Sequence, residues 1–226
     1  MATFKETRRH REKQREARRK QRMVAPAPAD SRITCITPTG DRPLAFALCQ
    51  RWIMNQTVKP DQWLVIDDGK KPMTPFVPME YVRREPKSTD PKHTLNLNIK
   101  TAIPLIKGDK ILILEDDEYY APQYIEEMSR RLDDHEIVGI IKAKYYHLIT
   151  GGYSQVGNDR HASLAQTAFR RSLLPELELL VDTKEKYLDI EIWKQVRSRG
   201  ANLHLFQDSD KLLYVGIKGL PGRAGI

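Results

Sequence analysis

The sequence predicts an α/β fold in which a mixed, mostly parallel, Rossmann-like sheet is flanked by helices, with a basic arm at the N-terminus. Three observations predict it. A strand, a helix and a second strand follow one another within about 35 residues from position 33, which is the pattern of a βαβ unit. Ile111 to Leu114 form a continuous apolar run, which is typical of a strand buried on both faces. Residues 1–23 hold ten Lys or Arg and three Glu, so they carry nearly all of the net charge of +8.

The composition indicates one good-sized domain in addition to the arm. The 226 residues are 40% hydrophobic, which is enough to build a core. Cys35 and Cys49 both stand among apolar residues. We therefore expect no disulfide framework and a reducing, cytoplasmic setting, or the host cytoplasm if the chain is viral. No apolar run approaches the length of a membrane span, so we expect a soluble protein, and its oligomeric state stays open.

The basic arm and a linker are expected to occupy residues 1–30, ahead of a single domain at 31–226. Residues 1–23 contain almost no apolar side chains, so they are expected to be disordered or a lone helix. Residues 25–30 form a Pro/Ala linker. The arm could bind DNA, RNA or acidic lipid, or it could be a solubilising tail without a partner.

The remaining elements are predicted in chain order from periodicity and from turn residues. Strands are predicted at 33–37, 62–66, 81–83, 111–114, 137–143, 164–170 and 202–206. Helices are predicted at 44–55, 96–106, 124–132 and 188–199. Pro104 should bend or end the second helix, and Gly200 should close the last one. The Gly-rich segments 151–161 and 211–226 are predicted to be loops, the first of them mobile.

Four consecutive acids, Glu115 to Glu118, follow the buried strand at 111–114. Like charges at one strand end repel each other and favour a counterion. The carboxyl ends of parallel strands are where open α/β sheets bind ligands. A divalent cation together with the phosphates of a substrate would satisfy both conditions. The alternative is a solvated acidic turn ahead of the next helix.

Five separated motifs stand in a fixed order between residues 33 and 206. They are Thr37-Pro38-Thr39 with Arg42-Pro43, Val65 to Gly69 after Gln56-Thr57 and Pro60, Lys107-Gly108-Asp109 with Leu114 to Asp117 and Tyr120-Ala121-Pro122, Thr167 to Arg171, and Leu188 to Glu191 ahead of Gly200. Together they resemble the GT-A glycosyltransferases of family 2, over about three quarters of the chain. Glu115 stands where that family usually has the first acid of its DxD motif, and Leu188 where it has Glu.

The resemblance implies an inverting, metal-dependent glycosyltransferase that moves a sugar from a nucleotide sugar, by expectation a UDP-sugar, to an acceptor hydroxyl. The metal implied is Mn²⁺ or Mg²⁺, held by Asp117 with Glu115 in support. The nucleotide-binding residues implied are Pro38, Thr39, Asp41, Arg42, Asp68, Lys100 and Asp116.

The same resemblance implies that Asp189 is the general base of the reaction, with Glu191 as second choice. Asp189 could instead be a simple helix cap. Lys218 and Arg223 in the Gly-rich tail could close over the diphosphate as a lid, or the tail could be frayed.

The acceptor and two rival functions stay open at this stage. The basic arm makes a hydroxymethylated base in DNA one candidate acceptor, and glycans, lipid-linked saccharides and proteins are others. A non-catalytic nucleotide-binding module tethered to nucleic acid is the main rival. A phosphotransferase or hydrolase of the haloacid dehalogenase kind ranks lower, because the DxDxT that such enzymes carry after the first strand is missing around Asp41.

Overall fold

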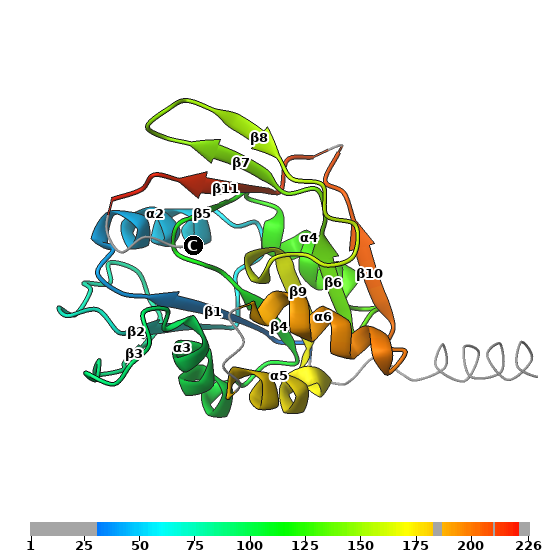
Figure 1. The fold of residues 1–226 in the computed structure, drawn as a ribbon, viewed down its shortest axis with the longest axis horizontal. Coiled ribbons are helices and arrows are strands. Elements are labelled where there is room, and N and C mark those ends of the chain that lie inside the picture. Colours follow the sequence, from blue (N-terminus) through cyan, green and yellow to red (C-terminus); the bar gives the residue numbers. More distant parts are fainter. Residues whose placement is uncertain (1–30, 183–186, 210, 222–226) are drawn as a thin grey trace, which may run out of the picture. The chain divides into compact units, whose positions relative to one another are not determined.

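A computed structural model describes residues 31–182, 187–209 and 211–221 of the chain (Figure 1). The predicted basic arm and linker, and Arg223 in the tail, lie outside these residues. In the described part, none of the helices is both long and apolar enough to cross a bilayer.

The central element is a seven-stranded sheet with the order β10-β6-β9-β4-β1-β2-β3. Its strands are β1 (Ile33–Thr39), β2 (Gln62–Asp67), β3 (Glu80–Arg83), β4 (Lys110–Ile113), β6 (Ile137–Ile140), β9 (Thr167–Arg170) and β10 (Leu203–Phe206). β9 runs antiparallel to β4 and β6, and the other neighbouring pairs are parallel. The predicted mixed, mostly parallel sheet is confirmed.

The strand β4 shows why the sheet is buried on both faces. Ile111 and Ile113 pack into one hydrophobic cluster, and Leu112 and Leu114 pack into the cluster on the opposite face. Successive side chains of a strand point to opposite faces, so an uninterrupted apolar run fills both layers. Burying each such side chain contributes about 1.5–3 kcal/mol relative to leaving it exposed.

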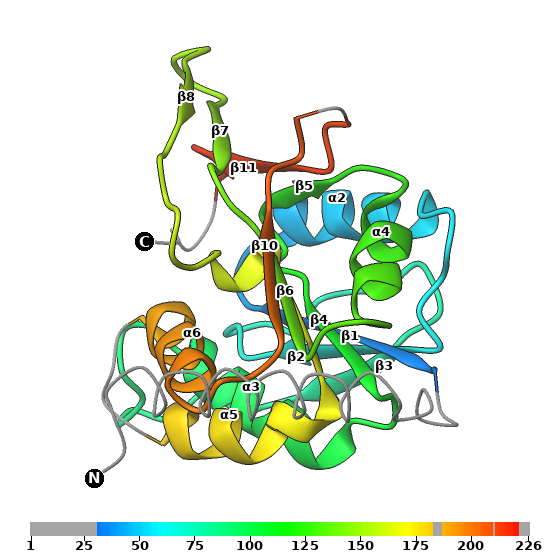
Figure 2. The ribbon, with the colours of Figure 1, turned by 90° about the vertical axis from the view of Figure 1, so that its right-hand side faces the viewer.

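Helices cover both faces of this sheet (Figures 1 and 2). The helices α2 (Pro43–Met54) and α4 (Tyr124–Arg131) cover one face, and α3 (Leu95–Ala102), α5 (Leu174–Val181) and α6 (Leu188–Ser198) cover the other. In α6 the buried residues Leu188, Ile192 and Val196 recur every four positions and make one apolar stripe. α3 gives way to a 3₁₀ turn (Ile103–Leu105) at Pro104, as predicted.

A second, four-stranded sheet has the order β5-β11-β7-β8. Its strands are β5 (Glu118–Tyr120), β7 (Lys144–His147), β8 (Tyr153–Gln155) and β11 (Tyr214–Lys218). The prediction of loops at 151–161 and 211–226 is therefore wrong where β8 and β11 form. The predicted strand at 137–143 also ends earlier, at Ile140.

Gly216 explains why a Gly-rich tail can still be a strand. A Cβ at this position would lie 2.2 Å from Cδ1 of Tyr145 on the neighbouring strand β7. Only glycine lets the two strands approach this closely, because any side chain would meet the ring. The glycine thus marks close packing within the small sheet rather than a loop.

Candidate functional site

A cleft of about 810 Å³ opens at the carboxyl ends of β1 and β4. We call it the acidic cleft. Its lining comes from several parts of the chain: the end of β1 with the loop after it, the segment leading into α3, the four acids after β4, the small sheet, the turn before β9, the end of α5 and the start of α6. The lining residues that carry polar or charged groups are Thr39, Arg42, Lys92, His93, Thr94, Asn96, Asn98, Glu115, Asp116, Asp117, Glu118, Tyr145, Ser163, Tyr187, Asp189, Tyr214 and Lys218.

Three of the four acids converge on one point in this cleft. Glu115, Asp117 and Glu118 each offer a carboxylate oxygen, and these oxygens all lie within 4.8 Å of one another. Oδ1 of Asp117 is buried and has no hydrogen-bond partner among the described residues. A buried carboxylate oxygen without a partner is costly in free energy. The donor set is therefore chemically suited to a hard divalent cation such as Mn²⁺ or Mg²⁺.

The loop after β1 is tied to the same acids. Oγ1 of Thr39 donates to Oδ2 of Asp116 at 2.6 Å. The Arg42 guanidinium makes ion pairs with Asp116, at 3.2 Å, and with Asp117. These contacts bring together two predicted motifs that stand more than 70 residues apart in the sequence.

The electrostatics of the cluster show how crowded the negative charge is. Burial raises the pKa of Glu115 to about 7 and the pKa of Glu118 to about 8, and the charge of Asp117 adds to both shifts. Lys218 opposes both shifts, because its Nζ lies 3.4 Å from Oε1 of Glu118. The acids are held together at an energetic cost that a bound cation would offset.

Lys218 is part of strand β11 and not of a loose lid. Oε2 of Glu118 accepts a hydrogen bond from the backbone N–H of Ile217 at 2.7 Å. Nζ of Lys218 also lies 5.3 Å from the centre of the Tyr145 ring. Lys218 thus lines the cleft as the last residue of β11, and its role in closing over the diphosphate stays a prediction.

Asp189 lines the cleft from the first turn of α6. Burial raises the pKa of its carboxyl, and a hydrogen bond to the backbone of Ile190 acts in the opposite direction. Glu191, the second choice for the base, does not line the cleft and pairs with Lys194 at 3.4 Å. The structure therefore brings Asp189, and not Glu191, into one cavity with the acids.

Three residues predicted to bind the nucleotide do not line the cleft. Asp41 has a φ of 55° and accepts a hydrogen bond from the backbone of Lys70 at 2.8 Å. Asp68 is buried and pairs with Arg84 at 2.6 Å. Lys100 is exposed and pairs with Asp182. The predicted residues that do line it are Pro38, Thr39, Arg42, Glu115, Asp116, Asp117, Asp189 and Lys218.

Several polar residues that line the cleft were not predicted from the sequence, and two of them, Glu118 and Tyr145, lie beside Lys218. Glu118 received no role, although its place in the run of four acids was a signal that could have found it. Tyr145 comes from β7, a strand that periodicity did not reveal. A segment without a recognised strand gives no indication of which side chains face a cavity.

Comparisons with known proteins bear on the fold. No protein-family model and no curated protein matches the sequence. Among solved structures, S. aureus TarS 1–349 matches with a TM-score of 0.61 and 15% identity, covering 82% of this chain and 60% of that one. TarS 1–349 in complex with UDP-GlcNAc matches with a TM-score of 0.60 and 15% identity, over 86% and 62% of the two chains.

The mannosyltransferase PcManGT from Pyrobaculum calidifontis, in complex with GDP-Man and Mn²⁺, matches with a TM-score of 0.60 and 16% identity. The match covers 90% of this chain and 63% of that one. The chain thus spans about three fifths of the length of these structures. In its sheet order, its helical layers and its likeness to these structures, the chain has the fold of the GT-A glycosyltransferases.

Proposed function

We propose that the chain is a metal-dependent glycosyltransferase that moves a sugar from a nucleotide sugar to an acceptor hydroxyl. The observation that carries the proposal is the acidic cleft. Glu115, Asp117 and Glu118 converge there, one oxygen of Asp117 is buried without a partner, and Asp189 lines the same cavity. A nucleotide-binding module would need the acids but would have no use for a base.

The leaving diphosphate is the first chemical problem that the cleft must solve. Asp117 would hold Mn²⁺ or Mg²⁺, with Glu115 and Glu118 in support. When bound, the ion would act as a Lewis acid on the departing diphosphate. Lys218 lies against Glu118 in the same cleft and would add a second positive charge beside the phosphates.

The nucleotide would lie against the loop after β1. Pro38, Thr39 and Arg42 line the cleft, and Asp116 is held by Thr39 and Arg42. We propose a UDP-sugar as the donor, with a GDP-sugar as the comparator, because the similar structures include complexes with UDP-GlcNAc and with GDP-Man.

Asp189 is proposed as the general base that removes the proton from the acceptor hydroxyl, so that attack proceeds with inversion. Its raised pKa favours such a role, because a carboxylate that binds a proton more tightly is a stronger base. Its position on a helix also fixes the carboxylate better than a loop would.

A hydroxymethylated base in DNA is our proposed acceptor, and a glycan is the alternative. Lys92 and His93 line the cleft and would lie beside an anionic acceptor. Arg83 and Arg84 stand shortly before Lys92 in the sequence, but they are engaged with Asp67 and Asp68 instead. The DNA proposal thus relies on the basic arm and on few residues of the domain.

The decisive experiment combines a binding assay with a transfer assay on the same preparation. Thermal shift with UDP and GDP, each with and without Mn²⁺, measures donor binding. Radiolabelled UDP- and GDP-sugars are then offered to hydroxymethylated DNA, to unmodified DNA and to glycans. Metal-dependent stabilisation with label transfer supports the proposal. Stabilisation without transfer to any acceptor, and without donor hydrolysis, would favour the binding module.

A further inference from the structure

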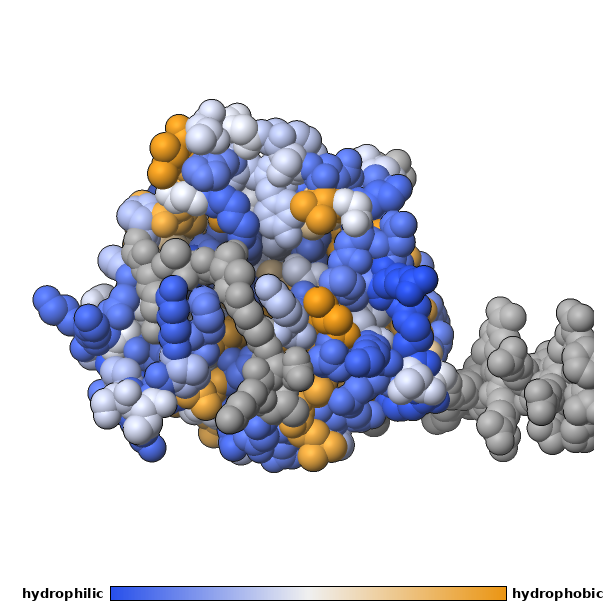
Figure 3. Space-filling view, viewed as in Figure 1, coloured by the Kyte–Doolittle hydropathy of each residue, from blue (hydrophilic) through white to orange (hydrophobic). Residues whose placement is uncertain are grey.

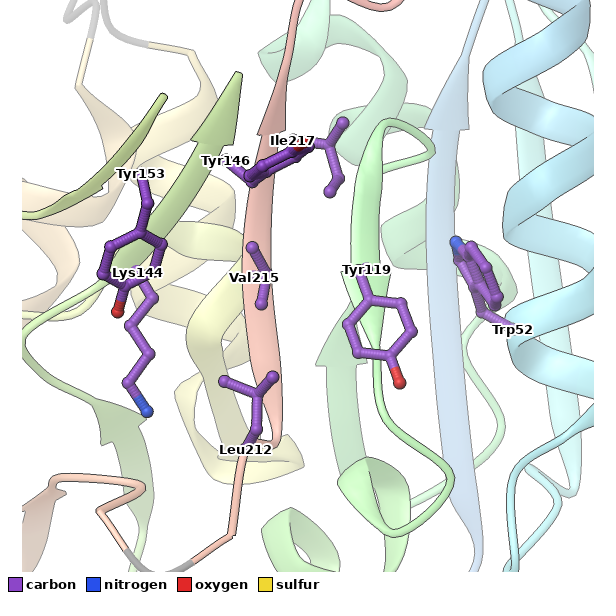
Figure 4. A pocket seen from close by; sticks show the side chains of 8 residues that line it. All are labelled: Trp52, Tyr119, Lys144, Tyr146, Tyr153, Leu212, Val215 and Ile217. Carbon is purple, nitrogen blue, oxygen red and sulfur yellow. The ribbon is translucent and has the colours of Figure 1, made fainter. Parts of the chain in front are cut away.

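The small sheet has two faces that differ in character. Strand alternation turns Glu118, Tyr145 and Lys218 toward the acidic cleft. Their neighbours Tyr119 on β5, Tyr146 on β7 and Ile217 on β11 point to the opposite face. They line a separate groove of about 600 Å³, which we call the outer groove (Figure 4). Its lining residues are Trp52, Tyr119, Lys144, Tyr146, Tyr153, Leu212, Val215 and Ile217.

The outer groove is apolar and rich in aromatic rings. Trp52 and Tyr119 meet edge to face with ring centres 5.0 Å apart. Lys144 is the one charged side chain among the lining residues, and it pairs with Asp208 at 2.7 Å. Apolar side chains scattered singly over a surface need no explanation, but a contiguous apolar patch marks an interaction site.

The hairpin of β7 and β8 extends this patch beyond the rest of the small sheet (Figures 1 and 2). Ile149 in its turn is 80% exposed, Tyr153 is 63% exposed, and Leu148 and Tyr146 are exposed as well. A hydrophobic patch lies at the free end of the hairpin in the space-filling view (Figure 3). The hairpin therefore presents its bulkiest apolar side chains at its most protruding point.

The charge of this region has one sign. Residues 141–158, which follow β6 and include the hairpin, contain no Asp or Glu, whereas Lys142, Lys144 and His147 stand among them. Lys144 is paired with Asp208, so Lys142 and His147 supply the cationic character of this segment. A protruding hairpin that carries no acid is complementary to an anionic surface.

We propose that the outer groove and the β7–β8 turn dock on an anionic lipid bilayer. Leu148 and Ile149 would enter the headgroup and acyl boundary, and Tyr146 and Tyr153 would lie at the headgroup level, where tyrosines are favoured. Insertion would be limited to the turn, because β8 is an edge strand whose outer backbone groups must stay hydrated. Tyr145 and Tyr146 are adjacent and point to opposite faces, so only the thickness of the small sheet would separate the acidic cleft from the lipid surface.

The test uses the full chain and vesicles of two compositions. Phosphatidylcholine vesicles, with and without phosphatidylglycerol, are sedimented with the protein at low and at high salt. High salt screens binding through the basic arm but leaves apolar insertion largely intact. Binding should rise with phosphatidylglycerol and should persist in part at high salt. The double variant Leu148→Ser with Ile149→Ser should lower the partition coefficient by about tenfold or more.

Leu179→Ser is the matched control. Leu179 on α5 is 71% exposed, so it tests the loss of an exposed leucine far from the hairpin. It should leave vesicle binding unchanged. Thermal unfolding of both variants, compared with the unchanged chain, checks that each is folded.

Tryptophan fluorescence provides a second readout. Trp63 and Trp193 are buried, and Trp52 is partly exposed in the outer groove. Brominated phospholipid should therefore quench the emission of Trp52, and Trp52→Phe should remove the quenching. Binding that is lost entirely at high salt and is unaffected by the hairpin variant would overturn the proposal. So would a dimer in light scattering that the hairpin variant dissociates, without vesicle binding, because a second copy would then be the occupant.

Discussion

At the scale of single residues, Asp117 has the least satisfied surroundings in the acidic cleft. Asp117→Ala should abolish transfer and remove the thermal shift that UDP gives in the presence of Mn²⁺, because the variant lacks the central ligand. EDTA should abolish the transfer activity of the unchanged enzyme until Mn²⁺ or Mg²⁺ is restored. Glu178→Ala, an exposed acid on α5, is the matched control. Full activity in chelator would remove the metal from the proposal.

A substitution at Asp189 distinguishes a general base from a helix cap. Asp189→Asn keeps the shape and caps a helix about as well as Asp, but it cannot take a proton. The variant should fold normally, bind donor with near-unchanged affinity and lose about 10²–10⁴-fold in turnover. Donor affinity by thermal shift and turnover by label transfer are measured on one preparation. Turnover that stays within a few-fold would identify a cap and leave Glu191 as the next residue to test.

The buried acids should make stability depend on pH. Burial raises the pKa of Glu115 to about 7 and of Glu118 to about 8, from 4.5. A carboxyl that binds its proton more tightly in the folded chain than in the unfolded chain adds to the free energy of unfolding. This contribution is complete below pH 4.5 and is lost as the pH rises through 7 to 8. The melting temperature in chelator should therefore fall over this range.

Glu118→Gln should flatten that fall, because the variant has one fewer carboxyl to deprotonate. Mn²⁺ should stabilise the unchanged chain more at higher pH, since its ligands must lose their protons first. Melting curves across the pH range, with Glu178→Gln as control, check both effects. An equally steep fall in Glu118→Gln would contradict the role given to this residue.

Asp116 and Asp117 show why some of the residues that line the cleft could be predicted from the sequence. Asp116 and Asp117 follow directly on a strand that the apolar run reveals, so the end of β4 fixes their position. Asp68 and Lys100 were placed by analogy alone, and their pairing with Arg84 and Asp182 depends on tertiary contacts that no local pattern shows. A motif predicts which residue types stand near a site, but neighbouring charges decide which of them face it.

At the scale of elements, Gly216 determines how closely β11 can approach β7. Gly216→Ala should lower the free energy of unfolding by about 1–3 kcal/mol, because its Cβ would meet the Tyr145 ring at 2.2 Å. Gly157→Ala, where nothing lies within 4 Å of the added Cβ, should change stability little. Denaturant unfolding of both variants measures the difference. Equal stabilities would show that the ring moves aside freely.

Strongly patterned elements were predictable, and the three-residue strands β5 and β8 were not. Helix α6 carries an apolar stripe with Gly200 behind it, and β1 is seven residues long. β5 and β8 have three residues each, which is too short for alternation to be distinguished from chance. These strands form because neighbours pair with them. The small sheet therefore depends on tertiary contacts, and so does the outer groove that it lines.

At the scale of the whole molecule, the body of the chain should be independent of the arm. Deleting residues 1–23 should leave thermal stability and donor binding unchanged, because both hydrophobic clusters lie within the described domain. If DNA is the acceptor, its binding should weaken and lose most of its salt dependence. Titrations at several salt concentrations check this. Unchanged DNA binding would place the electrostatic contact on the domain, near Lys92 and His93.

The ion pairs of Arg42 give the acidic cleft an internal competitor for its ligand. Arg42 pairs with Oδ2 of Asp117, whereas Oδ1 has no hydrogen-bond partner among the described residues, so a metal held by both oxygens of that carboxylate would have to displace the guanidinium. The displaced guanidinium would keep its ion pair with Asp116, so the loop after β1 would shift without leaving the acids. A spectroscopic probe on that loop would therefore report such metal binding without any substrate present.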